Sequence, residues 1–110
     1  MTASDSGSAG VIYEVRLEIA PEAIREFDAW LPGHADELLA LDGFEDYEII
    51  RHEQAAADGY LRRTVRYRLR DREALDRYFE EHAERLQADG RRRFGTVMRA
   101  ERQIHSPGKL

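Results

Sequence analysis

The chain contains four histidines, the side chains best suited to transfer a proton near neutral pH. They stand at positions 34, 52, 82 and 105, and no two of them have the spacing of a metal-binding motif. The sequence therefore predicts no metal site. His34 follows Trp30 by four residues, so both side chains can share one face of a helix. His34 or His82 could act as a general base, although a hydrogen-bonded core or boundary histidine is the more ordinary interpretation of each.

Several other reactive centres are missing from the sequence. There is no cysteine, which excludes a disulfide framework, a thiolate metal site and a cysteine nucleophile. The glycine patterns of a serine hydrolase, a dinucleotide site and a phosphate loop are all absent. We predict no cofactor. Asp89 and Gly90 precede three arginines and could hold an anion, but the pair is also typical of a turn that ends a helix, which we favour.

Charge is distributed unevenly along the 110 residues, whose formal net charge is −5. Residues 1–50 contain two arginines and twelve acids, whereas residues 51–110 contain fifteen basic and ten acidic residues. A net acidic chain without a basic stripe is a poor nucleic-acid binder, so we expect no such partner. No apolar run approaches the ~20 residues of a membrane span, and we expect no membrane partner. The first ten residues carry no positive charge and do not resemble a secretory signal, which favours a cytoplasmic protein.

Hydrophobic periodicity divides the chain into six elements between two short tails. We expect a disordered tail at residues 1–10, a folded domain at 11–105 and a second tail at 106–110. Strands are predicted at residues 11–19, 44–53, 60–70 and 94–104, and helices at 21–41 and 71–90. Proline inside a helix removes a hydrogen bond, so Pro32 and Gly33 should kink or break the first helix near residue 31. Gly90 should end the second helix.

The order β-α-β-β-α-β predicts an α+β fold, the ferredoxin-like sandwich. Its four-stranded antiparallel sheet would carry two helices on one face, with the first and third strands as central neighbours. The other face would carry Glu14, Arg16 and Glu18 on the first strand and Arg62, Arg66 and Arg68 on the third. Acids of the first strand would then lie opposite arginines of the third. This charged face could be solvated, could pair with a second copy of the chain, or could line a cavity for a polar or anionic small molecule.

Several segments together resemble the DUF4286 family. They are Tyr13-Glu14-Val15, Trp30-Leu31 with His34, Leu41-Asp42-Gly43-Phe44, Val65-Arg66-Tyr67 and, most specifically, the pattern HAxxLxADGxxRFG from His82 to Gly95. The likeness covers residues 11–104. It implies a dimeric α+β barrel in which two ferredoxin-like subunits join through their sheets, but it implies no activity. The wider superfamily includes cofactor-independent monooxygenases and haem-degrading enzymes. The positions that match the family and could form a site are Trp30, His34, His82, Arg85, Asp89 and Arg93.

Our leading hypothesis is a small homodimeric protein that binds a small molecule between a helix and the sheet. The residues expected to contact this ligand are Trp30, Arg66, Arg68, Arg85, Asp89 and Arg93. One alternative is a cofactor-independent monooxygenase or isomerase, with His34 or His82 as base and Arg66 or Arg68 holding an anionic substrate. Another alternative is a structural or regulatory interaction domain without a pocket.

Overall fold

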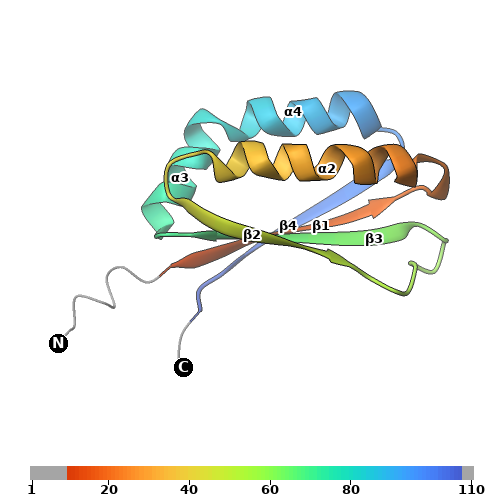
Figure 1. The fold of residues 1–110 in the computed structure, drawn as a ribbon, viewed down its shortest axis with the longest axis horizontal. Coiled ribbons are helices and arrows are strands. Elements are labelled where there is room, and N and C mark those ends of the chain that lie inside the picture. The colour runs from red at the N-terminus through yellow and green to blue at the C-terminus, as the bar shows by residue number, and fades with distance from the viewer. Residues whose placement is uncertain (1–9, 108–110) are drawn as a thin grey trace.

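The computed structural model describes residues 10–107 and has one sheet with a helical layer on one side (Figure 1). In chain order the elements are β1 (Val11–Ile19), the short 3-10 helix η1 (Pro21–Ala23), α2 (Ile24–Leu39), β2 (Phe44–Arg51), β3 (Leu61–Leu69), α3 (Arg72–Glu81), α4 (Ala83–Phe94) and β4 (Met98–His105). The predicted α+β, ferredoxin-like fold is confirmed. The predicted tails fall mostly outside the described residues, so the domain boundaries stay predictions.

The sheet has the strand order β2-β3-β1-β4, and every neighbouring pair is antiparallel. β1 and β3 are therefore the central strands, as predicted. Their register places Glu14 opposite Arg66 and Glu18 opposite Arg62. Since side chains alternate between the two sides of a strand, this register also fixes which residues point toward the helices.

The core lies between the helices and one face of the sheet. Tyr13, Ile19, Val65 and Leu69 point from the central strands, and all four are almost completely buried. The helices cover them with residues that recur every three or four positions, which on α2 are Phe27, Leu31, Ala35 and Leu38. The opposite face of the sheet carries no helix (Figure 1). It is called the outer face below.

Local sequence signals start and end most elements as expected. Asp71 caps α3, its carboxylate accepting a hydrogen bond of 2.9 Å from the backbone N–H of Ala74. Gly43 makes the turn before β2 with a φ of +92°, and a Cβ at this position would overlap Ala74. Substitution there would therefore both strain the backbone and collide with α3.

Of the kink or break predicted near residue 31, the break is wrong, because α2 runs from Ile24 to Leu39 with Pro32 inside it. Pro32 and Gly33 both lie on the exposed side of the helix. The pyrrolidine ring costs about 3 kcal/mol in a helix interior. Burial of Phe27 and Leu31 before the proline, and of Ala35 and Leu38 after it, holds both halves of the helix on the sheet and outweighs that cost.

The predicted second helix is wrong in two respects, because two helices occupy residues 72–94 and Gly90 lies inside α4. The helical path is interrupted at His82, whose φ is −130°. This interruption shifts the buried stripe by one residue, so that Ala83 and not His82 follows Tyr78 into the core. The helical layer therefore consists of three α-helices, where we predicted two.

The start of the last strand also differs from the prediction. Phe94 is the final residue of α4 and is buried, and β4 begins only at Met98. The alternation that suggested a strand from residue 94 was a coincidence of a helix end followed by a short connection. Among the described residues, no helix is both long enough and apolar enough to cross a membrane.

Candidate functional site

A cavity of about 50 Å³ lies between α2, α4 and the helix-covered face of the sheet. Its apolar lining comes mainly from Val15, Leu17, Leu31, Leu38, Val65, Leu86 and Met98. The polar groups that line it come from Tyr13, His34, Tyr67, Tyr78, Gln87 and Arg102. An apolar cavity with a few converging polar groups is the usual form of a small-molecule site.

Trp30 and His34 form one wall of the cavity. They are four residues apart on α2, and their rings stack with centroids 4.4 Å apart and an interplanar angle of 23°. Gly90 on α4 faces this wall, and a Cβ at Gly90 would lie 3.3 Å from the Trp30 ring. Gly90 therefore allows α4 to approach the indole, which explains a glycine inside a helix.

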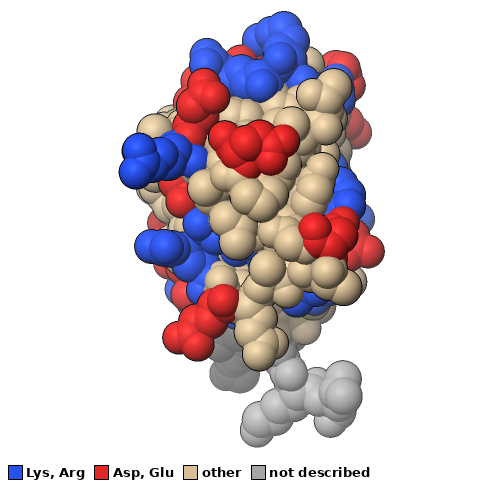
Figure 2. All heavy atoms as spheres, turned by 90° about the vertical axis from the view of Figure 1, so that its right-hand side faces the viewer, with Lys and Arg blue, Asp and Glu red and all other residues tan. Residues whose placement is uncertain are grey.

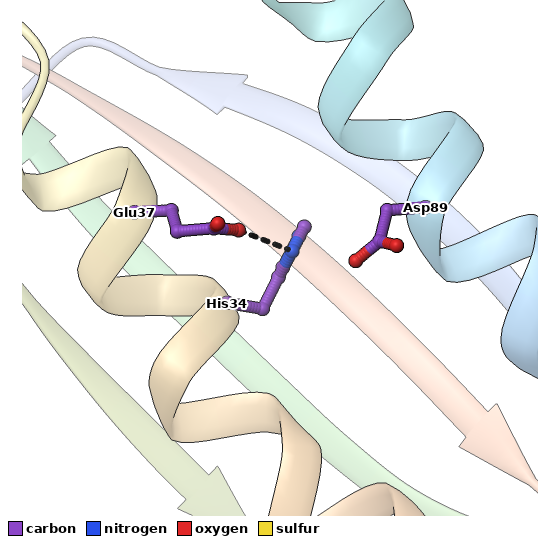
Figure 3. Close-up of side chains that lie close together, drawn as sticks. All are labelled: His34, Glu37 and Asp89. Carbon is purple, nitrogen blue, oxygen red and sulfur yellow. Dashed lines mark ion pairs between the residues drawn. The ribbon is translucent and has the colours of Figure 1, made fainter.

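The His34 imidazole lies between two carboxylates, as Figure 3 shows. Glu37, on the same helix, has a carboxylate oxygen 3.9 Å from His34 Nδ1, which is too long for a hydrogen bond. Asp89 approaches the imidazole from α4. Nδ1 is buried and has no hydrogen-bond partner. Burial lowers the pKa of His34, and this effect exceeds the opposing influence of Glu37 and Asp89, so the imidazole is neutral at pH 7.

Ligand atoms of His34, Glu37 and Asp89 all lie within 4.8 Å of one another, close enough to be considered for a metal ion. Asp89 is already engaged, however, because Arg92 and Arg93 both donate hydrogen bonds to it, at 3.0 and 3.4 Å. Burial raises the pKa of Asp89, but the neighbouring arginines and the Trp30 indole outweigh this and keep the pKa below its usual value. Asp89 is thus an ionised partner of arginines, and the trio is a poor cation site.

A second polar group surrounds the hydroxyl of Tyr13. Arg102, Tyr78 and Gln87 lie near this hydroxyl and lower its pKa, against the larger effect of burial. Burial raises the pKa values of Tyr13, Tyr67 and Tyr78, so all three phenols are protonated at neutral pH. Protonated phenols, an amide and a guanidinium can together donate several hydrogen bonds toward the cavity.

The structure brings together only some of the predicted site residues. Trp30, His34 and Asp89 meet at the cavity wall, and Arg93 reaches this group by its bond to Asp89. His82 lies at the junction of α3 and α4, with its Nδ1 3.1 Å from Arg85. Neither His82 nor Arg85 lines the cavity.

Arg66 and Arg68 lie on the outer face, on the side of the sheet opposite His34. Within one chain, therefore, neither arginine can hold a substrate against His34. The cavity residues that the sequence analysis missed include Gln87 and Arg102. Arg102 could have been found, because the alternation that places Met98 toward the helices continues to residue 102.

The outer face carries ion pairs between the acids and the arginines of its strands. Glu14 is almost fully buried there and accepts hydrogen bonds from Arg16 and from Arg66, the latter at 2.9 Å. Burial raises the pKa of Glu14, but these bonds outweigh it and lower the pKa below its usual value. A broad hollow of about 580 Å³ opens on this face, lined by charged residues that include Glu18, Arg62 and Arg99.

One end of the molecule shows how charge is distributed around the helical layer (Figure 2). Basic side chains gather at the top of this view, where α4 ends. The last turn of α4 contains Arg91, Arg92 and Arg93, and all three are exposed. The turn expected at Asp89 and Gly90 is wrong, because α4 continues to Phe94. Positive charge in the last turn of a helix suits the helix dipole.

Comparison with known proteins gives the family and the fold. Residues 10–105 match the model of DUF4286, described as a domain of unknown function. The chain belongs to this family. The resemblance drawn from the sequence motifs is therefore confirmed, and the match covers nearly the whole described part of this DUF4286 protein. No curated protein matches its sequence.

Solved structures similar to this DUF4286 protein share its fold. A mutant of SnoaB, a cofactor-independent oxygenase from Streptomyces nogalater, aligns with a TM-score of 0.71 at 16% identity, covering 93% of this chain and 96% of the other. Rv0793 from Mycobacterium tuberculosis aligns with a TM-score of 0.68 at 21% identity, covering 93% and 98%. A conserved protein from Methanosarcina mazei aligns with a TM-score of 0.69 at 15% identity, covering 96% and 99%. The shared fold is the α+β, ferredoxin-like fold.

Proposed function

We propose that this DUF4286 protein binds a small organic molecule in the cavity beneath α2 and α4. The observation that carries the proposal is the mixed lining: an apolar floor, the Trp30 wall and a few polar groups that include His34, Gln87 and Arg102. This composition is typical of ligand pockets and unusual for a packed core. It argues against an interaction domain that has no pocket.

The size of the cavity constrains how a ligand would enter. A volume of about 50 Å³ holds only a few water molecules, so an organic ligand must displace side chains at the mouth. Arg102 is exposed and Trp30 is only partly buried, and both can move more easily than the buried tyrosines. We therefore expect binding to shift Trp30.

Trp30 provides the test, because it is the only tryptophan in the chain. A library of mono- and bicyclic aromatic acids, amides and phenols is screened by the NMR signal of the Trp30 indole N–H. Hits should weaken at least several-fold in Gly90→Ala, whose new methyl group enters the cavity wall. Gly33→Ala is the matched control, because a Cβ at Gly33 meets no atom within 4 Å. Equal binding by both variants, or no shift with any compound, would refute the cavity as a ligand site.

A second candidate function is proton abstraction in a cofactor-independent oxygenase or isomerase. The favouring observation is His34, a neutral imidazole whose buried Nδ1 has no partner at the cavity. A neutral histidine can accept a proton from a bound substrate, as general-base catalysis requires. The likeness to SnoaB, an oxygenase by name, makes oxygen consumption a reasonable assay.

Compounds that shift Trp30 are tested for oxygen uptake and for deuterium exchange of acidic C–H groups. His34→Gln should reduce either activity by about a hundredfold or more, the usual range for a lost general base. His82→Gln should leave it unchanged, because His82 lies outside the cavity. Full activity in His34→Gln would exclude His34 as the base.

We also propose that the protein is a homodimer joined through the outer faces of its sheets. A twofold interface must be self-complementary, and acids alternating with arginines across β1 and β3 meet this requirement. Light scattering should give about twice the chain mass of 12.7 kDa, decreasing toward the monomer mass at high salt. Arg66→Glu should favour monomers, whereas Arg77→Glu on α3 should not. A monomer in wild type at low salt would refute the interface.

A further inference from the structure

Arg102 differs from most arginines of the sheet because it has no acidic partner. It points from β4 toward the helices and lines the cavity, yet its side chain is exposed. Within residues 10–107, no carboxylate oxygen lies within 4 Å of its guanidinium, whereas Arg99, three residues earlier, pairs with both Glu18 and Asp58. An arginine left unpaired beside an aromatic cavity is free to bind an anion in the planar, bidentate manner that guanidinium favours.

The charge of Arg102 acts on much of the cavity. It partly offsets the burial that raises the pKa of Tyr13, and it adds to the burial that lowers the pKa of His34. The charge of Arg102 also lowers the pKa values of Tyr67 and Tyr78, against the larger effect of burial. Arg102 and Tyr13 both line the cavity, which places the guanidinium near the Tyr13 hydroxyl.

The nearby acids do not cancel this positive charge. The negative charge of Asp89 is balanced by the hydrogen bonds that it accepts from Arg92 and Arg93. The Glu37 side chain is 59% exposed, so water screens its charge. The lining of the cavity therefore combines a cationic group with a stacked indole and imidazole and with apolar side chains that include Met98.

We propose that this cavity selects a flat aromatic anion, a carboxylate or phenolate, whose charged group pairs with Arg102 and whose ring packs beside Trp30. This inference rests on the proposed small-molecule function and adds the charge and shape of the ligand. Gln87 and Tyr13 also line the cavity, and an amide and a phenol can both donate hydrogen bonds to an anionic group.

The test compares naphthoate with naphthamide, two probes of nearly the same shape of which only the first is charged. Calorimetry measures affinity, and the Trp30 indole N–H signal reports whether the probe occupies the cavity. Wild type should bind naphthoate at least about tenfold more tightly than naphthamide, as expected for a charge-assisted pair. Arg102→Gln should reduce this preference to within about twofold, mainly by weakening the binding of naphthoate.

Two further variants make the result specific. Arg25→Gln removes the same charge from an exposed arginine of α2 that does not line the cavity, and it should keep the preference for naphthoate. Arg102→Lys should keep part of it, because an ammonium retains the charge without the planar fork. Equal affinities for both probes in wild type, or an unchanged preference in Arg102→Gln, would overturn this inference while the proposed cavity function stands. If neither probe shifted the Trp30 signal, the result would count against this inference and against the proposed cavity function.

Discussion

The two faces of the sheet differ in their side chains: one is apolar and covered by helices, and the other is charged. The helix-covered face presents Tyr13, Val65 and Leu69 to a layer of apolar helix residues. The outer face presents acids and arginines that pair with one another across β1 and β3. Both arise from a single two-residue alternation, so the sequence of one strand encodes two different surfaces.

The two faces also differ in the number of their charged side chains and in how these are paired. On the outer face, charges are numerous and mostly matched, as in the pairs of Arg66 with Glu14 and Arg68 with Asp46. On the helix-covered face charges are few. Arg63 is buried and paired with Asp28, whereas Arg102 has no acidic partner among residues 10–107. A matched charge contributes to structure, and an unmatched one is available to a ligand.

The largest expected loss of stability comes from removing a buried side chain on the helix-covered face. Phe27 is fully buried, and its ring lies 5.7 Å from that of Trp30 and 5.2 Å from that of Phe94. Phe27→Ala should lower the free energy of unfolding by about 3–5 kcal/mol, measured by chemical denaturation. Phe27→Leu, which retains most of the volume, should cost much less. A loss below about 1 kcal/mol in the alanine variant would mean that this face is not the main source of stability.

The next effect concerns the buried ion pair of the helix-covered face. Arg63 donates two hydrogen bonds of 2.9 Å to Asp28, and the Arg63 side chain is only 5% exposed. Asp28→Ala would leave this guanidinium unpaired. Because the Asp28 side chain is 40% exposed and water can reach the site, we expect a loss of about 1–3 kcal/mol.

Two variants distinguish the lost pair from a change in α2 itself. Glu26→Gln, on the exposed side of the same helix, should be nearly neutral. Adding Arg63→Met to Asp28→Ala should recover part of the stability, because it removes the unpaired charge. If the double variant were less stable than Asp28→Ala, the explanation by an unpaired charge would be wrong.

A smaller effect is expected from Glu14 on the outer face. Glu14→Gln should cost about 1 kcal/mol, because it weakens hydrogen bonds to two half-exposed arginines. The pKa of Glu14 is below its usual value of 4.5 in the folded protein. Its contribution is therefore present above about pH 4.5 and is lost as the pH falls through the lower folded pKa.

The measurement is the free energy of unfolding of wild type and Glu14→Gln as a function of pH. The gap between them should be widest above pH 4.5 and should close on acidification. Glu48→Gln is the matched control, since this exposed acid faces the same arginine at 3.8 Å. A gap that widened on acidification would contradict the argument.

The smallest effect should come from the rim of the outer face. Arg68 and Asp46 are 3.3 Å apart, and their side chains are 60% and 56% exposed. Arg68→Gln should change the free energy of unfolding of the monomer by no more than about 0.5 kcal/mol. Denaturation at low protein concentration measures this, and a loss above 1 kcal/mol would show that the outer face is more than a set of screened pairs.

How much the sequence predicts also differs between the two faces. Alternation in β1 and β3 was enough to place acids of β1 and arginines of β3 on the same outer face, because a register shifted by one residue would expose the apolar side. The individual pair of Glu14 with Arg66 was not predicted, since a shift by two residues keeps the same faces. The capped start of α3 at Asp71 was equally local. These features depend on residues close in sequence or on a strict period of two.

The candidate site was predicted only in part, because it depends on packing between distant elements. Gly90 stays helical because Trp30 packs against it from α2, and no signal near residue 90 reveals that contact. Pro32 stays helical because residues on either side of it bind the same core. Trp30 and His34 could be paired by their spacing, whereas the approach of Asp89 could not be predicted.

The register between the first and last strands has a practical consequence for engineering. Ile12 pairs with His105, so the chain enters and leaves the fold on adjacent strands, at positions about 5 Å apart. A linker of a few residues could join these two points without disturbing the sheet. New termini could then be opened in the exposed connection between β2 and β3, giving a circular permutant, or two copies could be fused in tandem to produce a single-chain dimer in which one cavity is altered and the other kept as an internal reference.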